Sequence, residues 1–299
     1  MKVLKDILYK VSLVSTSGSM DREVSEIAFD SRKVKQGTLF VAVRGTQVDG
    51  HDFIRKAIES GAAIIVCEDI PASLVDSVTY IAVKDSAQAL GIIASNFFDN
   101  PSSKLKLVGV AGTNCKTTGT TLLFDLFRQM GYSTGLLSTV VNKIDNKEIA
   151  ASHTTPDAIS LNQMLARMVD HGCEFCFMEA SSHAIDQRRV AGVEFTGGVF
   201  TNITHDHLDY HKTFDAYITA KKKLFDDLPS AAFALVNVDD KRGRIMLQNT
   251  KATKNTFALK SVAEFRAKLL ANSLHGLEMD IDGKHVWFKL IGDFNAYKL

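Results

Sequence analysis

Short apolar runs rich in β-branched residues recur along the chain, and apolar residues at helical spacing follow them. The runs occupy residues 38–43, 63–67, 80–83, 105–110, 135–139, 175–180, 198–201 and 233–238. Strand-like runs that alternate with helical patterns are typical of parallel sheets joined by crossover helices. The pattern therefore predicts an α/β fold with mostly parallel sheets.

The pattern breaks near residue 100. Four apolar residues before the break share one helical face: Leu90, Ile93, Ala94 and Phe97. Residues 100–103, Asn-Pro-Ser-Ser, then interrupt the helical spacing. We expect an N-terminal α/β domain over residues 1–100 and a second α/β domain over residues 101–299.

Composition adds limits to this fold. The 299 residues are 45% hydrophobic and 23% charged with a net charge of +1, which describes a folded chain without a basic surface for nucleic acid. No apolar run approaches the roughly 18 residues of a membrane span, and the first ten residues lack the core of a signal peptide. We therefore expect a cytoplasmic protein without membrane insertion. The cysteines are expected to be free thiols: Cys67, Cys115, Cys173 and Cys176.

A phosphate-binding loop is predicted at residues 109–118, Gly-Val-Ala-Gly-Thr-Asn-Cys-Lys-Thr-Thr, between a strand and a helix. Backbone N–H groups and the helix N-terminus of such a loop bind phosphate. Lys116 adds a positive charge, and the hydroxyl of Thr117 or Thr118 can reach Mg²⁺. The loop predicts ATP or GTP as ligand; the alternative is a glycine-rich turn that only links strand to helix.

Two residues of this loop and its helix depart from the usual pattern. Cys115 precedes the lysine, where glycine is usual, and its Cβ would crowd the phosphates or disfavour the backbone angles of the turn. We expect Cys115 to weaken ATP binding. Its place beside Lys116 at a helix N-terminus also favours a thiolate. Gly119, one turn into the helix, costs roughly 1 kcal/mol relative to alanine.

Carboxylates and histidines follow two other predicted strands. Glu179 ends the strand at 175–180, at the edge where α/β folds bind ligands, and is a Mg²⁺ candidate or a simple strand-end carboxylate. Residues 205–211 hold three histidines and two aspartates, more than a solvated loop needs. Metallo-β-lactamase-like hydrolases carry His-x-His-x-Asp-His, but Tyr210 breaks that register. Mg²⁺ with a nucleotide fits better.

A lysine continues the next apolar helical stripe. The apolar members are Phe214, Tyr217, Ile218, Leu224 and Phe225. Spacing of three and four residues places Lys221 on the same face, while Lys222 and Lys223 fall toward solvent. A buried ammonium needs a partner or a modification. The alternative is a lysine whose stem lies along the core and whose amine reaches water.

Five motifs follow one another along the second expected domain, between residues 112 and 221. They are Gly112-Thr-Asn-x-Lys116-Thr-Thr, Thr154-Thr-Pro-Asp157, Met178-Glu-Ala-Ser-Ser-His-Ala-Ile-Asp-Gln-Arg-Arg189, Thr201-Asn-Ile-Thr-His-Asp-His-Leu-Asp-Tyr-His211 and Ala220-Lys221. Together they resemble the Mur ligases of peptidoglycan synthesis. Near the N-terminus, Asp30-Ser31-Arg32 and Asp49-Gly50-His51 resemble that family's uridine-nucleotide domain. The nearest resemblance is to the member that adds the third residue of the peptide.

The resemblance implies ATP and Mg²⁺ as cofactors and assigns roles to the motif residues. The catalytic residues would be Lys116, Glu179, His207 and Lys221. The metal would be held by Thr117, Glu179, His207 and Lys221, the lysine as a carbamate. The ATP-binding residues would be Gly112, Thr113, Asn114, Cys115, Lys116, Thr117, Thr118, Asn237, Asp240 and Asn295. Asn295 lies in Gly292-Asp-Phe-Asn-Ala-Tyr-Lys298, which has lysine where the family's segment ends in asparagine.

The resemblance also implies the substrates and the reaction. UDP-N-acetylmuramoyl-L-alanyl-D-glutamate would be contacted by Ser31, His51, Thr154, Thr155, Ser182 and Arg189. Its carboxylate would attack the γ-phosphate of ATP, and the amine of a diamino acid would displace the resulting acyl phosphate. No nucleophilic serine or cysteine is needed.

Two further expectations concern activity. The family's C-terminal domain, which carries the amino-acid pocket, is expected to lie beyond Leu299, so the chain alone would bind substrate without making product. The alternative from another class is a nucleotide- or UDP-sugar-binding module that does not catalyse. Within the ligases, a folylpolyglutamate-synthase-like protein is disfavoured by residues 30–32 and 154–157.

Overall fold

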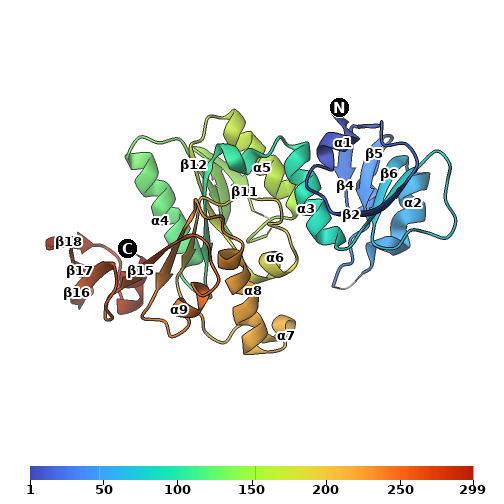
Figure 1. Cartoon of the computed structure of the whole chain (residues 1–299). Helices are drawn as coiled ribbons and strands as arrows, with labels where there is room; N and C mark the ends of the chain where they lie inside the picture. The colour runs from blue at the N-terminus through green and yellow to red at the C-terminus, as the bar shows by residue number, and fades with distance from the viewer. Residues whose placement is uncertain (47, 152, 299) are drawn as a thin grey trace. The chain divides into compact units, whose positions relative to one another are not determined.

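The computed structural model describes residues 1–46, 48–151 and 153–298, which fall into two compact units. The first unit comprises Met1–Ser102, Pro156–Arg167 and Gln187–Val193. The second comprises Ser103–Thr155, Met168–Asp186 and Glu194–Leu299. Colour in Figure 1 follows the chain through both units from blue to red.

The first unit is built on a sheet of five strands among the described residues, in the order β2-β7-β6-β5-β4. The strands are β2 (Leu13–Ser17), β4 (Glu26–Ala28), β5 (Thr38–Val41), β6 (Ala62–Cys67) and β7 (Thr79–Val83). Strands β4 to β7 pair in parallel, and β2 joins β7 antiparallel. A separate short pair joins β1 (Lys2–Val3) to β3 (Glu23–Val24).

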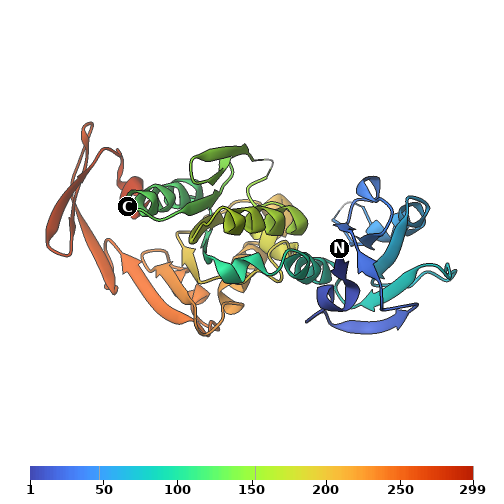
Figure 2. The ribbon, with the colours of Figure 1, turned by 90° about the horizontal axis from the view of Figure 1, so that it is seen from above.

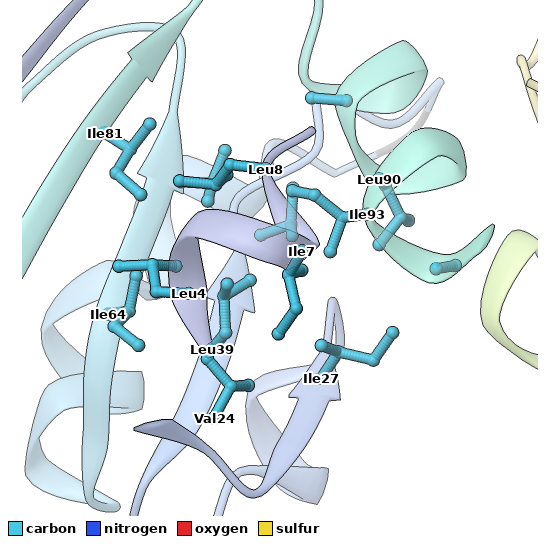
Figure 3. Packing of buried hydrophobic residues seen from close by; sticks show 14 of the residues in the cluster. Leu4, Ile7, Leu8, Val24, Ile27, Leu39, Ile64, Ile81, Leu90 and Ile93 are labelled. Carbon is cyan, nitrogen blue, oxygen red and sulfur yellow. The ribbon is translucent and has the colours of Figure 1, made fainter. Parts of the chain in front are cut away.

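Strands β5, β6 and β7 are buried on both faces of the sheet, and alternate residues of each strand point to opposite sides. Its helices are α1 (Leu4–Ile7), α2 (Ile54–Glu59) and α3 (Ser86–Phe97), with the 3₁₀ turns η1 (Ser31–Lys33), η2 (Gly50–Phe53) and η3 (Pro101–Lys104) nearby in sequence. Leu39 packs with α1 and α3 on one face, whereas Phe40 belongs to the core on the other. Figure 3 shows Leu4 and Ile7 of α1 between the strands and Ile93 of α3.

The second unit has a sheet of eleven strands over the described ranges, in the order β11-β10-β9-β12-β8-β13-β14-β15-β16-β17-β18. The strands are β8 (Lys106–Ala111), β9 (Thr134–Leu137), β10 (Val141–Ile144), β11 (Lys147–Ala150), β12 (Phe175–Glu179), β13 (Gly197–Phe200), β14 (Phe233–Asn237), β15 (Thr253–Ala258), β16 (Phe265–Ser273), β17 (Gly276–Ile281) and β18 (Lys284–Phe288). The run from β9 to β16 is parallel, and antiparallel strands extend it at both ends. Figure 2 shows the β16–β18 extension in dark orange to red.

Two helices cover opposite faces of the central strands. The remaining helical elements of the chain are α4 (Lys116–Gln129), α5 (Ala158–Asp170), α6 (Ser182–Asp186), α7 (Leu208–His211), α8 (Phe214–Asp226), α9 (Gly243–Met246) and η4 (Asp293–Lys298). Phe124 of α4 packs with Val108 of β8. Gly109 follows Val108 in β8 and therefore points to the opposite face of the sheet, where Leu224 of α8 lies beside it. A side chain at Gly109 would collide with Phe195, so glycine is needed for this close approach.

The predicted α/β class with mostly parallel sheets is confirmed. All eight apolar runs are strands, with ends displaced by at most two residues. The antiparallel strands at the edges were not predicted. In the part of the chain that is described, no helix combines the length and apolar character needed to cross a membrane.

Candidate nucleotide and metal site

The predicted motifs of the second unit meet at one edge of its sheet. Strands β8, β12, β13 and β14 run parallel, so their carboxyl ends emerge together. The phosphate loop follows β8, Glu179 ends β12, and residues 201–211 follow β13. Asn237 ends β14, and residues 238–240 follow it. Ligands of open α/β sheets bind at this edge.

The loop after β13 holds the phosphate loop in place. Thr201 donates its hydroxyl to the carbonyl of Asn114 at 2.7 Å, and Asn114 N–H donates to the amide oxygen of Asn202 at 2.9 Å. The Thr113 hydroxyl accepts from Thr204 N–H at 3.0 Å. Gly112 sits against Thr201, where a Cβ would collide with the hydroxyl. The loop therefore keeps its shape through contacts with the neighbouring strand end.

Cys115 adopts a left-handed backbone, with φ +73° and ψ −4°, immediately before the first residue of α4. A residue with a Cβ rarely takes this conformation, whereas glycine does so without strain. The expected conflict between Cys115 and the turn is therefore present in its backbone angles. Thr117 and Thr118 follow in the first turn of α4 and are partly buried.

Two lysines converge on a single carbonyl of this loop. Lys221 Nζ donates to Gly112 O at 2.7 Å, and Lys116 Nζ donates to the same oxygen at 3.0 Å. Lys116 also donates to Thr113 O at 2.9 Å. Burial lowers the pKa of Lys116, an effect opposed by the negative charges of Glu179 and Asp206. Glu179 is thus within electrostatic reach of the loop lysine.

Lys221 is buried, as the helical spacing predicted. Its side chain is among the largest fully buried ones, with the residue 1% exposed. Nζ lies 4.6 Å from the centre of the Tyr217 ring. Burial, and next the charge of Lys116, lowers the pKa of Lys221 to about 7. The environment therefore favours the neutral form of this amine more than water does.

The expectation that Lys222 faces solvent is wrong. Its side chain is 12% exposed and its Nζ lies 2.6 Å from Asp226 Oδ1, one helical turn further along α8. The amine pairs with a carboxylate four residues later, which the apolar spacing alone did not indicate. Lys223 is more exposed, at 37%, and pairs with Asp227.

Glu179 is a buried carboxylate whose two oxygens meet one residue. It is 1% exposed. Thr139 N–H donates to Oε1 at 2.8 Å, and the Thr139 hydroxyl donates to Oε2 at 3.2 Å. Thr139, which follows β9, was not among the predicted site residues.

His207 lies in a group of aromatic rings that includes Tyr217, the ring beside Lys221. It takes a left-handed backbone, φ +53°, and its ring centre is 6.1 Å from that of Tyr217. His183 lies 4.8 Å from His207 and 5.5 Å from His211, between ring centres. Burial lowers the pKa of His211. Tyr217, whose hydroxyl lies 3.1 Å from Thr113 Oγ1, thus links the histidines to the phosphate loop.

The residues expected near the nucleotide base engage the chain itself. Asn237 donates its amide to Thr201 O at 2.9 Å. Asp240 accepts from Ile203 N–H at 2.8 Å and from Arg242 N–H at 2.8 Å. Asn295 lies in η4 and donates to Ile291 O. Asn237 and Asp240 therefore tie the strand end of β14 to that of β13.

Three predicted substrate residues lie close to Glu179 in the second unit. Thr154 Oγ1 is 3.1 Å from Thr139 Oγ1. The Thr155 hydroxyl donates to the Glu179 carbonyl at 2.7 Å. Ser182 Oγ lies 3.0 Å from His211 Nε2, and both residues are buried.

The other three predicted substrate residues belong to the first unit. Ser31 is buried in η1, behind the capping residue Asp30. His51 Nδ1 lies 2.6 Å from Asp49 Oδ1, and its Nε2 accepts from Glu68 N–H at 2.9 Å, so both ring nitrogens meet groups of the chain. Arg189 donates Nε to Gln187 Oε1 at 3.0 Å.

The donor set at the edge fits Mg²⁺ bound together with phosphate. Among the described residues, no three His, Cys, Asp or Glu side chains form a metal cluster by themselves. Mg²⁺ usually takes one or two carboxylates and fills its other positions with phosphate oxygens and water. The buried carboxylate of Glu179 and the Thr117 hydroxyl beside the loop provide this kind of oxygen donor.

Fold and site define an α/β protein with a phosphate-binding loop at the carboxyl edge of a parallel sheet. A family model described as the Mur ligase middle domain matches residues 110–298, and one described as the Mur ligase family, catalytic domain matches residues 23–98. The chain belongs to the Mur ligase family.

Curated relatives extend well beyond the chain. It is 62% identical over 298 residues to the UDP-N-acetylmuramoyl-L-alanyl-D-glutamate--2,6-diaminopimelate ligase of Cytophaga hutchinsonii, covering 99% of this chain and 61% of that protein. The Parabacteroides distasonis ligase of the same name is 52% identical over 296 residues, with the same two coverages. The chain thus spans about three fifths of these relatives' length.

Solved structures agree on the fold. One is titled as the structure of a UDP-N-acetylmuramoyl-L-alanyl-D-glutamate--2,6-diaminopimelate ligase; it matches with a TM-score of 0.82 at 24% identity, over 99% of this chain and 61% of that one. MurF ligase from Thermotoga maritima, solved with ADP, matches with a TM-score of 0.60 at 19% identity, over 91% of this chain and 60% of that one. These likenesses show the Mur ligase fold.

Proposed function

We propose that this chain supplies the UDP-substrate and ATP sites of a ligase that adds 2,6-diaminopimelate to UDP-N-acetylmuramoyl-L-alanyl-D-glutamate. Residues 1–100 would be the UDP-substrate domain and residues 101–299 the ATP domain, in a cytoplasmic enzyme of peptidoglycan synthesis. The observation that carries the proposal is the convergence of Lys116 and Lys221 on Gly112 O, with Glu179 in electrostatic reach. The relatives' names supply the choice of amino acid.

Lys116 would act on the γ-phosphate. Its amine lies at the loop that points N–H groups at phosphate, so it would offset charge that builds up while the substrate carboxylate attacks. The acyl phosphate formed in this way would then be displaced by the incoming amine. Catalysis of this kind rests on positioning and electrostatics rather than on a protein nucleophile.

Glu179, Thr117 and His207 would hold Mg²⁺, with Lys221 as a carbamate. Bound Mg²⁺ would neutralise phosphate charge during transfer. The pKa of Lys221, about 7, supports the modification, because the free amine is the form that adds to CO₂. The nitrogen of the neutral amine bonds to the carbon of CO₂, one C=O π bond opens and one N–H proton leaves, so that a neutral amine becomes an anionic carbamate.

A second candidate is a module that binds nucleotide or UDP-sugar without catalysing. The left-handed backbone of Cys115 favours it, because strain and a Cβ at this point of the loop oppose the close placement of phosphate that turnover requires. The two candidates differ in ATP turnover rather than in fold.

Calorimetry separates the proposal from its rival. The chain is titrated with ATP plus Mg²⁺, and separately with UDP-N-acetylmuramoyl-L-alanyl-D-glutamate. We expect both to bind, and Lys116→Ala to abolish ATP binding while leaving the UDP-substrate affinity unchanged. ADP release that depends on UDP-substrate, measured with the C-terminal part of a relative fused to the chain, tests catalysis. Binding of both ligands without any such release would favour the module.

A further inference from the structure

Thr139 makes contact with both oxygens of the buried carboxylate that the proposed function assigns to Mg²⁺. Its backbone N–H reaches Glu179 Oε1 at 2.8 Å and its hydroxyl reaches Oε2 at 3.2 Å. Two bonds from a single residue fix the plane of the carboxylate as well as its position. Thr139 itself is exposed, so these two hydrogen bonds, rather than burial of its side chain, hold it beside Glu179.

The Thr139 hydroxyl also meets Thr154, at 3.1 Å between the two oxygens. A hydroxyl has one hydrogen to donate and two lone pairs to accept with. The Thr139 hydroxyl lies within donor distance of both Glu179 Oε2 and Thr154 Oγ1 but has one hydrogen. A carboxylate oxygen can only accept, so that hydrogen goes to Glu179, and the Thr154 hydroxyl supplies the hydrogen between the two threonines. The hydrogen bonds therefore run in one direction, from Thr154 through Thr139 to Glu179.

This direction determines what Thr154 offers to a ligand. Because its hydrogen is used toward Thr139, the Thr154 hydroxyl offers a ligand only the lone pairs of its oxygen. A substrate group that contacts Thr154 must then be a donor, such as an amide N–H or a sugar hydroxyl, rather than a phosphate or carboxylate oxygen.

We propose that Thr139 is a positioning residue that aligns Glu179 for Mg²⁺ and connects it to Thr154. The inference rests on the proposed function, in which Glu179 holds the metal. Partners that orient a ligating carboxylate typically change metal affinity 10- to 100-fold when they are removed. Loss of the Thr139 hydroxyl leaves the N–H bond to Oε1 and frees Oε2.

The test is the gain in ATP affinity that Mg²⁺ produces, measured by calorimetry with Mg²⁺ and with a chelator. In Thr139→Val, which keeps the shape and the N–H group, we expect this gain to fall about tenfold while metal-free ATP binding stays unchanged. Thr139→Ser, which restores the hydroxyl, should recover the gain. Thr253→Val is the matched control, since Thr253 is exposed in β15 of the same unit.

A second variant tests the connection to Thr154. Thr154→Val removes the hydrogen donated to Thr139 and should reduce the Mg²⁺ gain less than Thr139→Val does. In the Thr139→Val background it should cause no additional loss, because the two residues act through one chain of bonds.

Three results would overturn the inference, and they are distinguishable. An undiminished Mg²⁺ gain in Thr139→Val, with a normal gain in the parent, removes the role of Thr139 and leaves the proposed function intact. No Mg²⁺ gain in the parent removes the metal role of Glu179 and with it both proposals. Equal losses with and without Mg²⁺, not restored by Thr139→Ser, would show that Thr139 only supports the fold.

Discussion

Cys115 is the residue at which the phosphate loop departs from its usual composition. Its left-handed backbone costs roughly 1–2 kcal/mol for a residue with a Cβ. Glycine removes that cost but loses more chain entropy on folding, by roughly 0.5–1 kcal/mol. The two effects oppose each other, and the backbone strain is the larger.

Cys115→Gly should therefore stabilise the protein by about 1 kcal/mol and strengthen ATP binding. Urea unfolding and ATP calorimetry measure the two effects. Cys115→Ala is the matched control, because it removes the sulfur and keeps the Cβ. An equal gain in the alanine variant would place the cause in the thiol and contradict the backbone explanation.

Cys115 should also be the first thiol to react with iodoacetamide. It is partly exposed, whereas the other three cysteines are buried. Burial raises the pKa of Cys67 to about 11 and also raises the pKa values of Cys173 and Cys176. Peptide mass spectrometry over a time course identifies the labelled residue, and ATP with Mg²⁺ should slow labelling. Labelling of Cys67 at the same rate would refute this expectation.

Prediction from sequence succeeded for most residues in local patterns, with Lys222 as an exception, and failed for distant partners. Lys221 was placed inward because its neighbours on the helix are apolar. Tyr217 was assigned only to that apolar stripe, since its hydroxyl partner Thr113 lies 104 positions away in the chain. The sequence predicts Thr139 only as the end of a strand, because nothing local links it to Glu179, 40 positions later.

The strands that the sequence predicts well are those buried in the middle of a sheet. Central parallel strands are covered on both faces and appear as continuous apolar runs. Strands β10, β11 and β16 to β18 lie toward the ends of the sheet, and their exposed positions carry polar residues such as Lys147 and Lys268. Such strands lack an apolar run and were missed for that reason.

Helix α4 contains a glycine that its surroundings do not require. A Cβ at Gly119 would meet no heavy atom within 4 Å. Glycine inside a helix costs roughly 1 kcal/mol relative to alanine. Gly119→Ala should therefore raise the free energy of unfolding by up to about 1 kcal/mol, as urea denaturation would measure.

Gly112→Ala is the opposite case and serves as the comparison. Its Cβ would collide with the Thr201 hydroxyl, which holds the loop through Asn114 O. We expect this variant to lose both stability and ATP binding. A stabilised Gly112→Ala protein, or a destabilised Gly119→Ala protein, would contradict the packing described for this loop and helix.

At the scale of the molecule, one carboxylate joins three segments of the second unit that are distant in sequence. Asp239, after β14, accepts from the N–H groups of Leu259, Lys260 and Ser261, and from the Tyr297 hydroxyl of η4 at 3.0 Å. Burial alone would raise the pKa of Asp239, but the hydrogen bonds outweigh it and hold the pKa well below its usual range. Burial and this carboxylate raise the pKa of Tyr297 to about 12.

Stability should consequently fall at both ends of the pH scale. A carboxyl with a lowered pKa contributes above its unfolded pKa, roughly 4, and that contribution disappears as the pH falls below it. A tyrosine with a raised pKa contributes below roughly pH 10, and the contribution disappears between there and about 12. Urea unfolding across pH measures both slopes.

Two variants test whether Asp239 causes the loss of stability at acid pH and Tyr297 the loss at alkaline pH. Asp239→Asn should reduce stability at pH 7 and flatten the acid slope, and Tyr297→Phe should flatten the alkaline slope only. Unchanged slopes in both variants would show that other groups govern the pH dependence.

The central claim is that Lys116, Glu179, His207 and Lys221 gather around triphosphate and metal at one sheet edge. A crystal structure of this chain with a non-hydrolysable ATP analogue and Mn²⁺ tests it most directly, because Mn²⁺ is located by its anomalous signal. We predict phosphates at Lys116 and a manganese peak beside Glu179 and Thr117. An analogue bound away from residues 112–118, or manganese only at other carboxylates, would contradict the account.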